Sequence, residues 1–181
     1  MSESRPPRYL PAWPLPERAY LPGRDPRPSA SAASTVPDAP LPAADAEPAV
    51  WRRHPVFLCA VDRYNHGFPW EAHEAWELLW RRAAPGSTVH HLLQALIQCA
   101  ATVVHVRAGR TAGVRAVSAR ALAHLDAVIA DAGQPGWHRG RFMGIDVAGF
   151  RSVFHAYAGS DEPLGDGPAI ELSEPDPASA G

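Results

Sequence analysis

The chain has 181 residues, 20 of them proline, and a formal net charge of −2 at pH 7. Twelve prolines lie in the first 48 residues and four lie after Ala158, so we expect a packed core only in the central segment. That segment contains twelve arginines against seven acidic residues, whereas the two tails together carry a charge of −7. No arginine run or basic strip with interleaved aromatic residues occurs, which argues against nucleic-acid binding.

Cysteine usage and apolar segments argue against further classes of protein. Cys59 and Cys99 stand singly inside apolar runs, so neither a disulfide framework nor a zinc-thiolate motif is expected. The first residues lack the pattern of a signal peptide. The longest weakly polar stretch, residues 92–104, is too short to span a bilayer. We therefore expect a cytoplasmic protein without a membrane partner.

The two tails differ in composition from the centre. Residues 1–48 have no apolar periodicity and predict a proline-rich, mostly disordered arm. The aromatic and leucine side chains of residues 9–22 leave an alternative open, an extended strap on the folded domain. Residues 159–181 are acidic and predict a second disordered tail, which leaves residues 49–158 as the folded domain.

Helical periodicity dominates the centre of the chain. The predicted helices run from Pro55 to Tyr64, from Pro69 to about Ala83, after Ser87 to about Ala108, after Thr111 to Gly133, and after Asp146 to about Tyr157. No segment alternates with period two for long enough to be a strand. We therefore predict an all-α fold, a compact up-down bundle of four to five helices, with the helix after Ser87 as its most buried element.

Three polar side chains share one face of the second predicted helix. At about 100° per residue, His73, Glu74 and Glu77 fall within a single arc, and Trp76 lies on the adjacent apolar face. Glu71 lies on a different flank. The first three residues are therefore placed to act together.

The third predicted helix carries a polar stripe on an otherwise apolar cylinder. Its members recur every three or four residues and are His91, Gln94, Gln98, Thr102 and His105. Buried amides and imidazoles need partners, because each unpaired one costs about 1–3 kcal/mol. An antiparallel hairpin folded about Gly86 brings Gln98 opposite His73, so we expect the two polar sets to meet between these helices.

Carboxylates beside imidazoles can bind a divalent metal ion of the zinc, manganese or iron type, or act as general acid and base. As metal ligands we predict His73, Glu74 and His105. As catalytic groups we predict Glu74 and Glu77, one of which would activate water.

Glu71, Gln98 and Trp76 are the predicted contacts to a small ligand. Structural roles explain several of these residues as well. Glu71 stands in the first helical turn, where a carboxylate satisfies free N–H groups. Glu77 and Arg81 form an i,i+4 pair, and the tryptophans suit a bundle core.

The run from Tyr64 to Arg81, followed by Leu96-Ile97-Gln98 and by His105, resembles the bacterial and archaeal domain of unknown function 309 family. Its signature is similar: asparagine and glycine, aromatic residues, Glu-x-His-Glu-x-x-Glu-x-x-Trp, and then a Leu-Ile-Gln helix. The resemblance covers about residues 50–158 and implies a small helical bundle with no established activity. The positions that it marks as a polar site are Glu71, His73, Glu74, Glu77, Gln98 and His105.

Two classes of function remain open. The first is a metal or small polar ligand site, hydrolytic in one form, between the second and third helices. The second is a non-enzymatic assembly or interaction module, with a homo-oligomer as one form, whose polar cluster is a structural hydrogen-bond network. A third, binding of an anionic ligand, rests on charge alone and would use Arg81, Arg82, Arg107 and Arg110.

Overall fold

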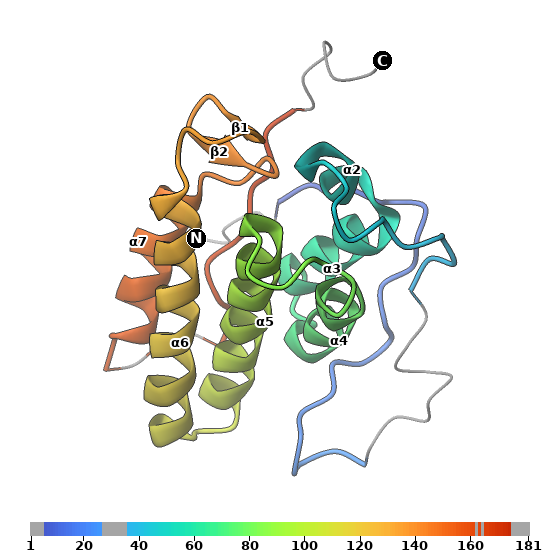
Figure 1. Ribbon diagram of the computed structural model, residues 1–181. Helices are drawn as coiled ribbons and strands as arrows, with labels where there is room; N and C mark the ends of the chain where they lie inside the picture. Colours follow the sequence, from blue (N-terminus) through green and yellow to red (C-terminus); the bar gives the residue numbers. More distant parts are fainter. Residues whose placement is uncertain (1–5, 27–35, 162, 164, 175–181) are drawn as a thin grey trace.

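The computed structural model describes residues 6–26, 36–161, 163 and 165–174 (Figure 1). The predictions for the remaining residues of the two tails lie outside this part of the chain. The described helices are α2 (Pro48–Arg53), α3 (Pro55–Asn65), α4 (Pro69–Trp80), α5 (Thr88–Arg107), α6 (Thr111–Ala130) and α7 (Val147–Ala158). Two short strands, β1 (Trp137–His138) and β2 (Arg141–Phe142), lie between α6 and α7.

The all-α bundle is confirmed. Helix α3 packs on α4, α4 on α5, α5 on α6, and α6 on α7, so neighbours in sequence are neighbours in space. Figure 1 shows α5 between α4 and α6. This central position accounts for the burial of the apolar residues of α5.

The start signals of the helices act as the sequence predicts. The Ser87 side chain accepts a hydrogen bond from the His90 N–H, and the Asp146 side chain accepts one from the Gly149 N–H. Helix α4 ends at Trp80 instead of Ala83, and Thr111 is the first residue of α6 instead of its cap.

Three elements were not predicted. Helix α2 begins at Pro48, which the proline count had assigned to the arm. The strands β1 and β2 pair antiparallel, with Trp137 opposite Phe142, across a two-residue turn in which Arg139 and Gly140 both have positive φ. A two-residue ladder is too short to show an alternating pattern, so periodicity could not detect it.

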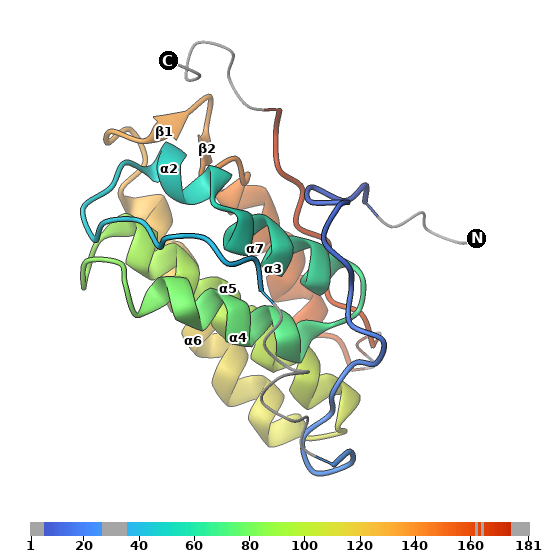
Figure 2. The same ribbon diagram turned by 90° about the vertical axis from the view of Figure 1, so that its right-hand side faces the viewer.

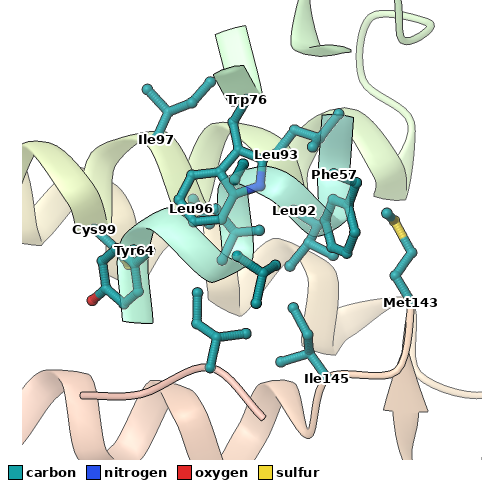
Figure 3. Close-up of a cluster of buried hydrophobic side chains, with 14 of the residues drawn as sticks. Phe57, Tyr64, Trp76, Leu92, Leu93, Leu96, Ile97, Cys99, Met143 and Ile145 are labelled. Atoms are coloured by element: carbon teal, nitrogen blue, oxygen red, sulfur yellow. The ribbon is translucent and has the colours of Figure 1, made fainter. Parts of the chain in front are cut away.

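The core forms where α5 meets α3 and α4. Figure 3 shows Trp76 of α4 among the leucines of α5, with Phe57 and Tyr64 of α3 beside them. By length and composition α5 could also cross a membrane, although most of that apolar window is buried inside the bundle and core helices pass the same test. Burial of this apolar surface is the main force that holds the helices together.

The described parts of both tails lie on the bundle, so the prediction of mostly disordered tails does not hold for them. Figure 2 shows the N-terminal segment, in blue, running along the side of the bundle past α3. Residues 6–26 thus take the alternative form, an extended strap. At the other end, Ile170 is fully buried and Leu172 pairs with Ile145. Hydrogen bonds to side chains of the bundle hold both segments in place.

Candidate functional site

The polar face of α4 forms a chain of contacts within its own helix. His73 Nε2 lies 3.3 Å from Glu77 Oε1, and Glu77 Oε2 accepts a hydrogen bond from Arg81 at 2.8 Å. The Trp70 ring stacks on the His73 ring, with 5.7 Å between centroids. The predicted i,i+4 pair of Glu77 and Arg81 is therefore confirmed.

Three members of the α5 stripe, and Thr88 at the start of the helix, lie against α6, whereas the Thr102 hydroxyl donates to the Gln98 carbonyl within α5. The contacting pairs are Thr88 with Asp131, His91 with His124, Gln98 with Arg120, and His105 with Gly113. These pairs run in opposite directions along the two helices, as an antiparallel seam requires. The contacts of His91, Gln98 and His105 with α6 give no support to the expectation that this stripe meets the polar face of α4.

Gln98 illustrates the reason. Its side-chain oxygen lies 3.5 Å from Arg120 Nε of α6, whereas we expected it opposite His73 of α4. An antiparallel hairpin fixes which residues lie level along its two helices. It does not fix how far each helix is turned about its own axis, and that rotation directs the stripe toward α6.

His105 also belongs to the α6 side. A Cβ atom added at Gly113 would collide with the His105 ring, so the two helices approach closely here. Burial, with Arg110 and Arg120 nearby, lowers the pKa of His105 and favours its neutral form. Its Nδ1 is buried and has no hydrogen-bond partner within the described chain.

The predicted metal ligands are consequently not assembled. Among the residues that the structure describes, no three His, Cys, Asp or Glu side chains are grouped so that they could hold a metal ion. His73 contacts Glu77 and Trp70, His105 lies against Gly113, and Glu74 lies near Glu71, whose pKa it helps to raise. The set of His73, Glu74 and His105 gains no support from this arrangement.

Trp76 is part of the core. Its side chain is completely buried, and its ring packs against that of Tyr64, with 5.9 Å between centroids (Figure 3). Complete burial favours the structural interpretation of this tryptophan and gives no support to a ligand contact. The apolar face of α4 simply extends to this position.

Glu71 has a different role from the other residues of the motif. Its side chain is buried, and Oε1 accepts a hydrogen bond from the Tyr20 main-chain N–H at 2.8 Å. Burial raises the pKa of Glu71, a shift opposed by the Tyr20 N–H, by its own N–H and by Arg63, and reinforced by Glu74. The N-terminal strap thus lies directly on a family-motif residue.

Asp62 of α3 binds the same strap and was missed in the sequence. It is 1% exposed, and its two carboxylate oxygens accept hydrogen bonds from the N–H groups of Tyr9 at 2.7 Å and Leu10 at 2.9 Å. Arg8 Nε lies 3.4 Å from Oδ2. The sequence feature that could have identified Asp62 is its place as an acidic residue inside the apolar run of residues 56–64.

Asn65 holds the C-terminal segment in a similar way. Its amide donates to the Ile170 carbonyl and accepts from the Ile170 N–H, both at 2.8 Å. Arg107 adds contacts to the Gly165 carbonyl and to Asp166. The sequence indicated only that Asn65 ends a helix. The polar side chains of α3 and α4 therefore bind main-chain groups of both tails.

Three histidines form a second polar cluster, of which the sequence singled out only His91. His91 and His124 face each other across the α5–α6 seam with 3.0 Å between their Nδ1 atoms, so one must donate and the other accept. Burial lowers the pKa of His90 and of His124, and the neighbouring imidazoles add to both shifts. The lowered pKa of His124 favours its neutral form, which suits this hydrogen bond between the two helices.

A cavity of about 1350 Å³ lies away from the α4 motif. Residues of α7 and of the C-terminal segment line it, together with Asn65 and Arg107. None of the six positions marked by the family resemblance lines this cavity. Its position gives no support to a ligand site on α4.

Residues 57–117 match the model of a family described as Domain of unknown function (DUF309). This segment belongs to the DUF309 family. The match runs from α3 into α6 and contains Asp62, Asn65 and Glu71, whereas both tails lie outside it. It is shorter than the 50–158 span expected from the motifs. No curated protein and no solved structure was found to match the chain.

Proposed function

We propose that the DUF309 segment of this chain is a non-enzymatic interaction module that binds extended polypeptide through main-chain N–H groups. Its acceptors are the buried carboxyl groups of Asp62 and Glu71, and in this chain the bound polypeptide is its own N-terminal strap. The observation that carries the proposal is the Asp62 carboxylate, both of whose oxygens accept strap N–H groups.

The energetics favour a binding role for this carboxylate. A carboxylate that is 1% exposed has lost its hydration and is stable only if donors replace the water. The N–H groups of Tyr9 and Leu10 and the Arg8 guanidinium supply them, and a hydrogen bond to a charged group contributes about 1.5–3 kcal/mol. Without the strap, Asp62 would face solvent or an unfilled surface.

A metal-dependent or hydrolytic function has weaker support. It needs His73, Glu74 and His105 in one coordination shell, or Glu74 and Glu77 free to activate water. Glu77 is instead engaged by His73 and Arg81 along α4, and His105 lies against α6. The contacts of Asp62 and Glu71 with the strap support the interaction module instead.

Cleavage of the strap tests the proposal in the full chain. Cleavage at a protease site inserted within residues 27–35 would break the covalent link between residues 1–26 and the bundle. We expect the cleaved segment to stay bound to the bundle through gel filtration. Asp62→Asn should weaken retention by about tenfold or more, because one charge-assisted acceptor is lost.

Asp126→Asn serves as the matched control, because Asp126 is an exposed carboxylate that pairs with Arg151 far from the strap in sequence. It should leave retention unchanged. Separation of the cleaved strap from the wild-type bundle would contradict the proposal, as would equal retention in the Asp62→Asn variant.

A further inference from the structure

The strap contains the same three residues twice. Tyr-Leu-Pro occurs at residues 9–11 and again at 20–22. Each copy presents its tyrosine N–H to a buried carboxyl group, Tyr9 to Asp62 at 2.7 Å and Tyr20 to Glu71 at 2.8 Å. The bundle therefore has two comparable acceptor sites, which we call the Asp62 site and the Glu71 site.

The Asp62 site is completely used. Both of its oxygens accept main-chain N–H groups, from Tyr9 and Leu10, and the guanidinium of Arg8 lies beside Oδ2. The tetrapeptide at this site is Arg-Tyr-Leu-Pro. A basic residue, an aromatic residue and two free N–H groups together match one buried carboxylate.

The Glu71 site is only half used. Its Oε2 is buried and accepts no hydrogen bond from any residue that the structure describes. The N–H group that would correspond to that of Leu10 belongs to Leu21, and it donates instead to Asp25 within the strap at 2.8 Å. Ala19 stands where Arg8 stands in the first copy, so the strap itself brings no guanidinium to this site. The Arg63 guanidinium of α3 lies nearby and donates to the Glu71 main-chain carbonyl at 3.3 Å.

The surroundings of the Glu71 site provide an aromatic contact for a bound segment. The Tyr20 ring meets the Trp70 ring edge-on at 5.2 Å, and Trp70 in turn stacks on His73. Beyond the site, the Pro22 carbonyl accepts a bond from Arg110 at 3.3 Å in an exposed position. The second Tyr-Leu-Pro copy thus donates fewer hydrogen bonds to its carboxyl group than the first copy does.

We propose that the Glu71 site binds an Arg-Tyr-Leu-Pro type of extended segment from a partner protein, which displaces residues 19–22 of the strap. The partner's second N–H and its arginine fill the acceptor that the strap leaves open, while the Asp62 site keeps the strap attached. This inference rests on the proposed function and adds the chemistry of the partner. The strap is then a replaceable occupant of a site whose better ligand comes from another chain.

A short peptide tests the proposal on the full chain. The probe is a fluorescein-labelled peptide with the sequence of residues 6–13, which contains Arg-Tyr-Leu-Pro, and binding is followed by fluorescence anisotropy. We expect saturable binding that Glu71→Gln weakens by about tenfold or more and that Asp126→Asn leaves unchanged. A peptide with alanine in place of its arginine should bind about tenfold more weakly to the wild-type chain.

Amide hydrogen exchange identifies the site that the peptide occupies. Bound peptide should accelerate exchange of the Tyr20 N–H and leave those of Tyr9 and Leu10 unchanged. Acceleration at Tyr9 and Leu10 instead, or the absence of saturable binding, would overturn the proposal. In the absence of peptide, Ala19→Arg should slow hydrogen exchange of the Tyr20 N–H about tenfold. This result does not depend on folding of the Glu71→Gln variant.

The outcomes separate this inference from the proposed function. If the cleaved strap leaves the wild-type bundle, the interaction module itself is wrong. If the strap is retained but the peptide does not bind and Ala19→Arg does not slow Tyr20 exchange, only the assignment of the partner is wrong.

Discussion

Asp62 and Glu71 are both buried carboxyl groups, yet they meet different numbers of hydrogen-bond donors. Asp62 has two main-chain donors and a guanidinium, whereas Glu71 accepts one hydrogen bond from the strap. Burial favours the neutral form of a carboxyl group, and donors favour the charged form. For Glu71 burial prevails and its pKa is raised above the ordinary value of 4.5.

This raised pKa predicts a pH dependence of stability. The neutral form of Glu71 is favoured by folding, so its contribution is complete below 4.5 and is lost as the pH rises through the raised value. The unfolding free energy of the wild type minus that of Glu71→Gln should therefore fall as the pH rises above 4.5. Urea denaturation of both proteins across this range measures it, and a difference that grows with pH would show that the carboxylate is net stabilised.

At the scale of elements, the seam between α5 and α6 depends on a close approach. Gly113 lies where the His105 ring comes nearest to α6, and a side chain there would displace the ring. Along the same seam, His91 and His124 share a hydrogen bond and Thr88 donates to Asp131. A residue without a Cβ thus sets the spacing at one end, and polar pairs set it at the other.

Gly113→Ala tests this spacing. In most helix interiors the change would stabilise by up to about 1 kcal/mol. Here we expect a loss of about 1–3 kcal/mol, because the added methyl group overpacks the seam. Thermal or urea unfolding measures the loss, and His105→Ala is the matched background, in which Gly113→Ala should become neutral or stabilising. An equal loss in both backgrounds would exclude the His105 contact as its cause.

At the scale of the whole molecule, the two tails are fastened to the same helices and to each other. Asp62 and Asn65, near the end of α3, hold the N-terminal strap and the C-terminal segment respectively. The Tyr9 hydroxyl also accepts a hydrogen bond from the Leu172 N–H at 2.8 Å. One turn of helix thus joins segments from opposite ends of the chain.

Asn65→Ala should loosen the C-terminal segment without unfolding the bundle. The change removes two hydrogen bonds and leaves the buried Ile170 N–H without its acceptor, a cost of about 1–3 kcal/mol. Hydrogen exchange at Ile170 and Leu172 should accelerate, whereas amides at the centre of α5 should exchange only as fast as global unfolding allows. Unchanged exchange at Ile170 would mean that apolar burial alone holds the segment.

The sequence by itself determined the helices and the family. Apolar spacing, the prolines at helix starts and the caps at Ser87 and Asp146 are local signals, and they act over a few residues wherever the chain lies. The run from Tyr64 to Arg81 identified the family for the same reason. The short α2 and the two-residue strands were not predicted, because each is too short to show a periodic pattern of apolar residues.

Only the tertiary structure decided which polar groups meet. The rotation of α5 about its axis directs Gln98 and His105 toward α6, and it depends on how all the apolar faces pack at once. The donors that reach Asp62 and Glu71 are main-chain N–H groups, which nearly every residue has and which therefore leave no mark in a sequence. The partners of these carboxyl groups become visible only when distant segments lie side by side.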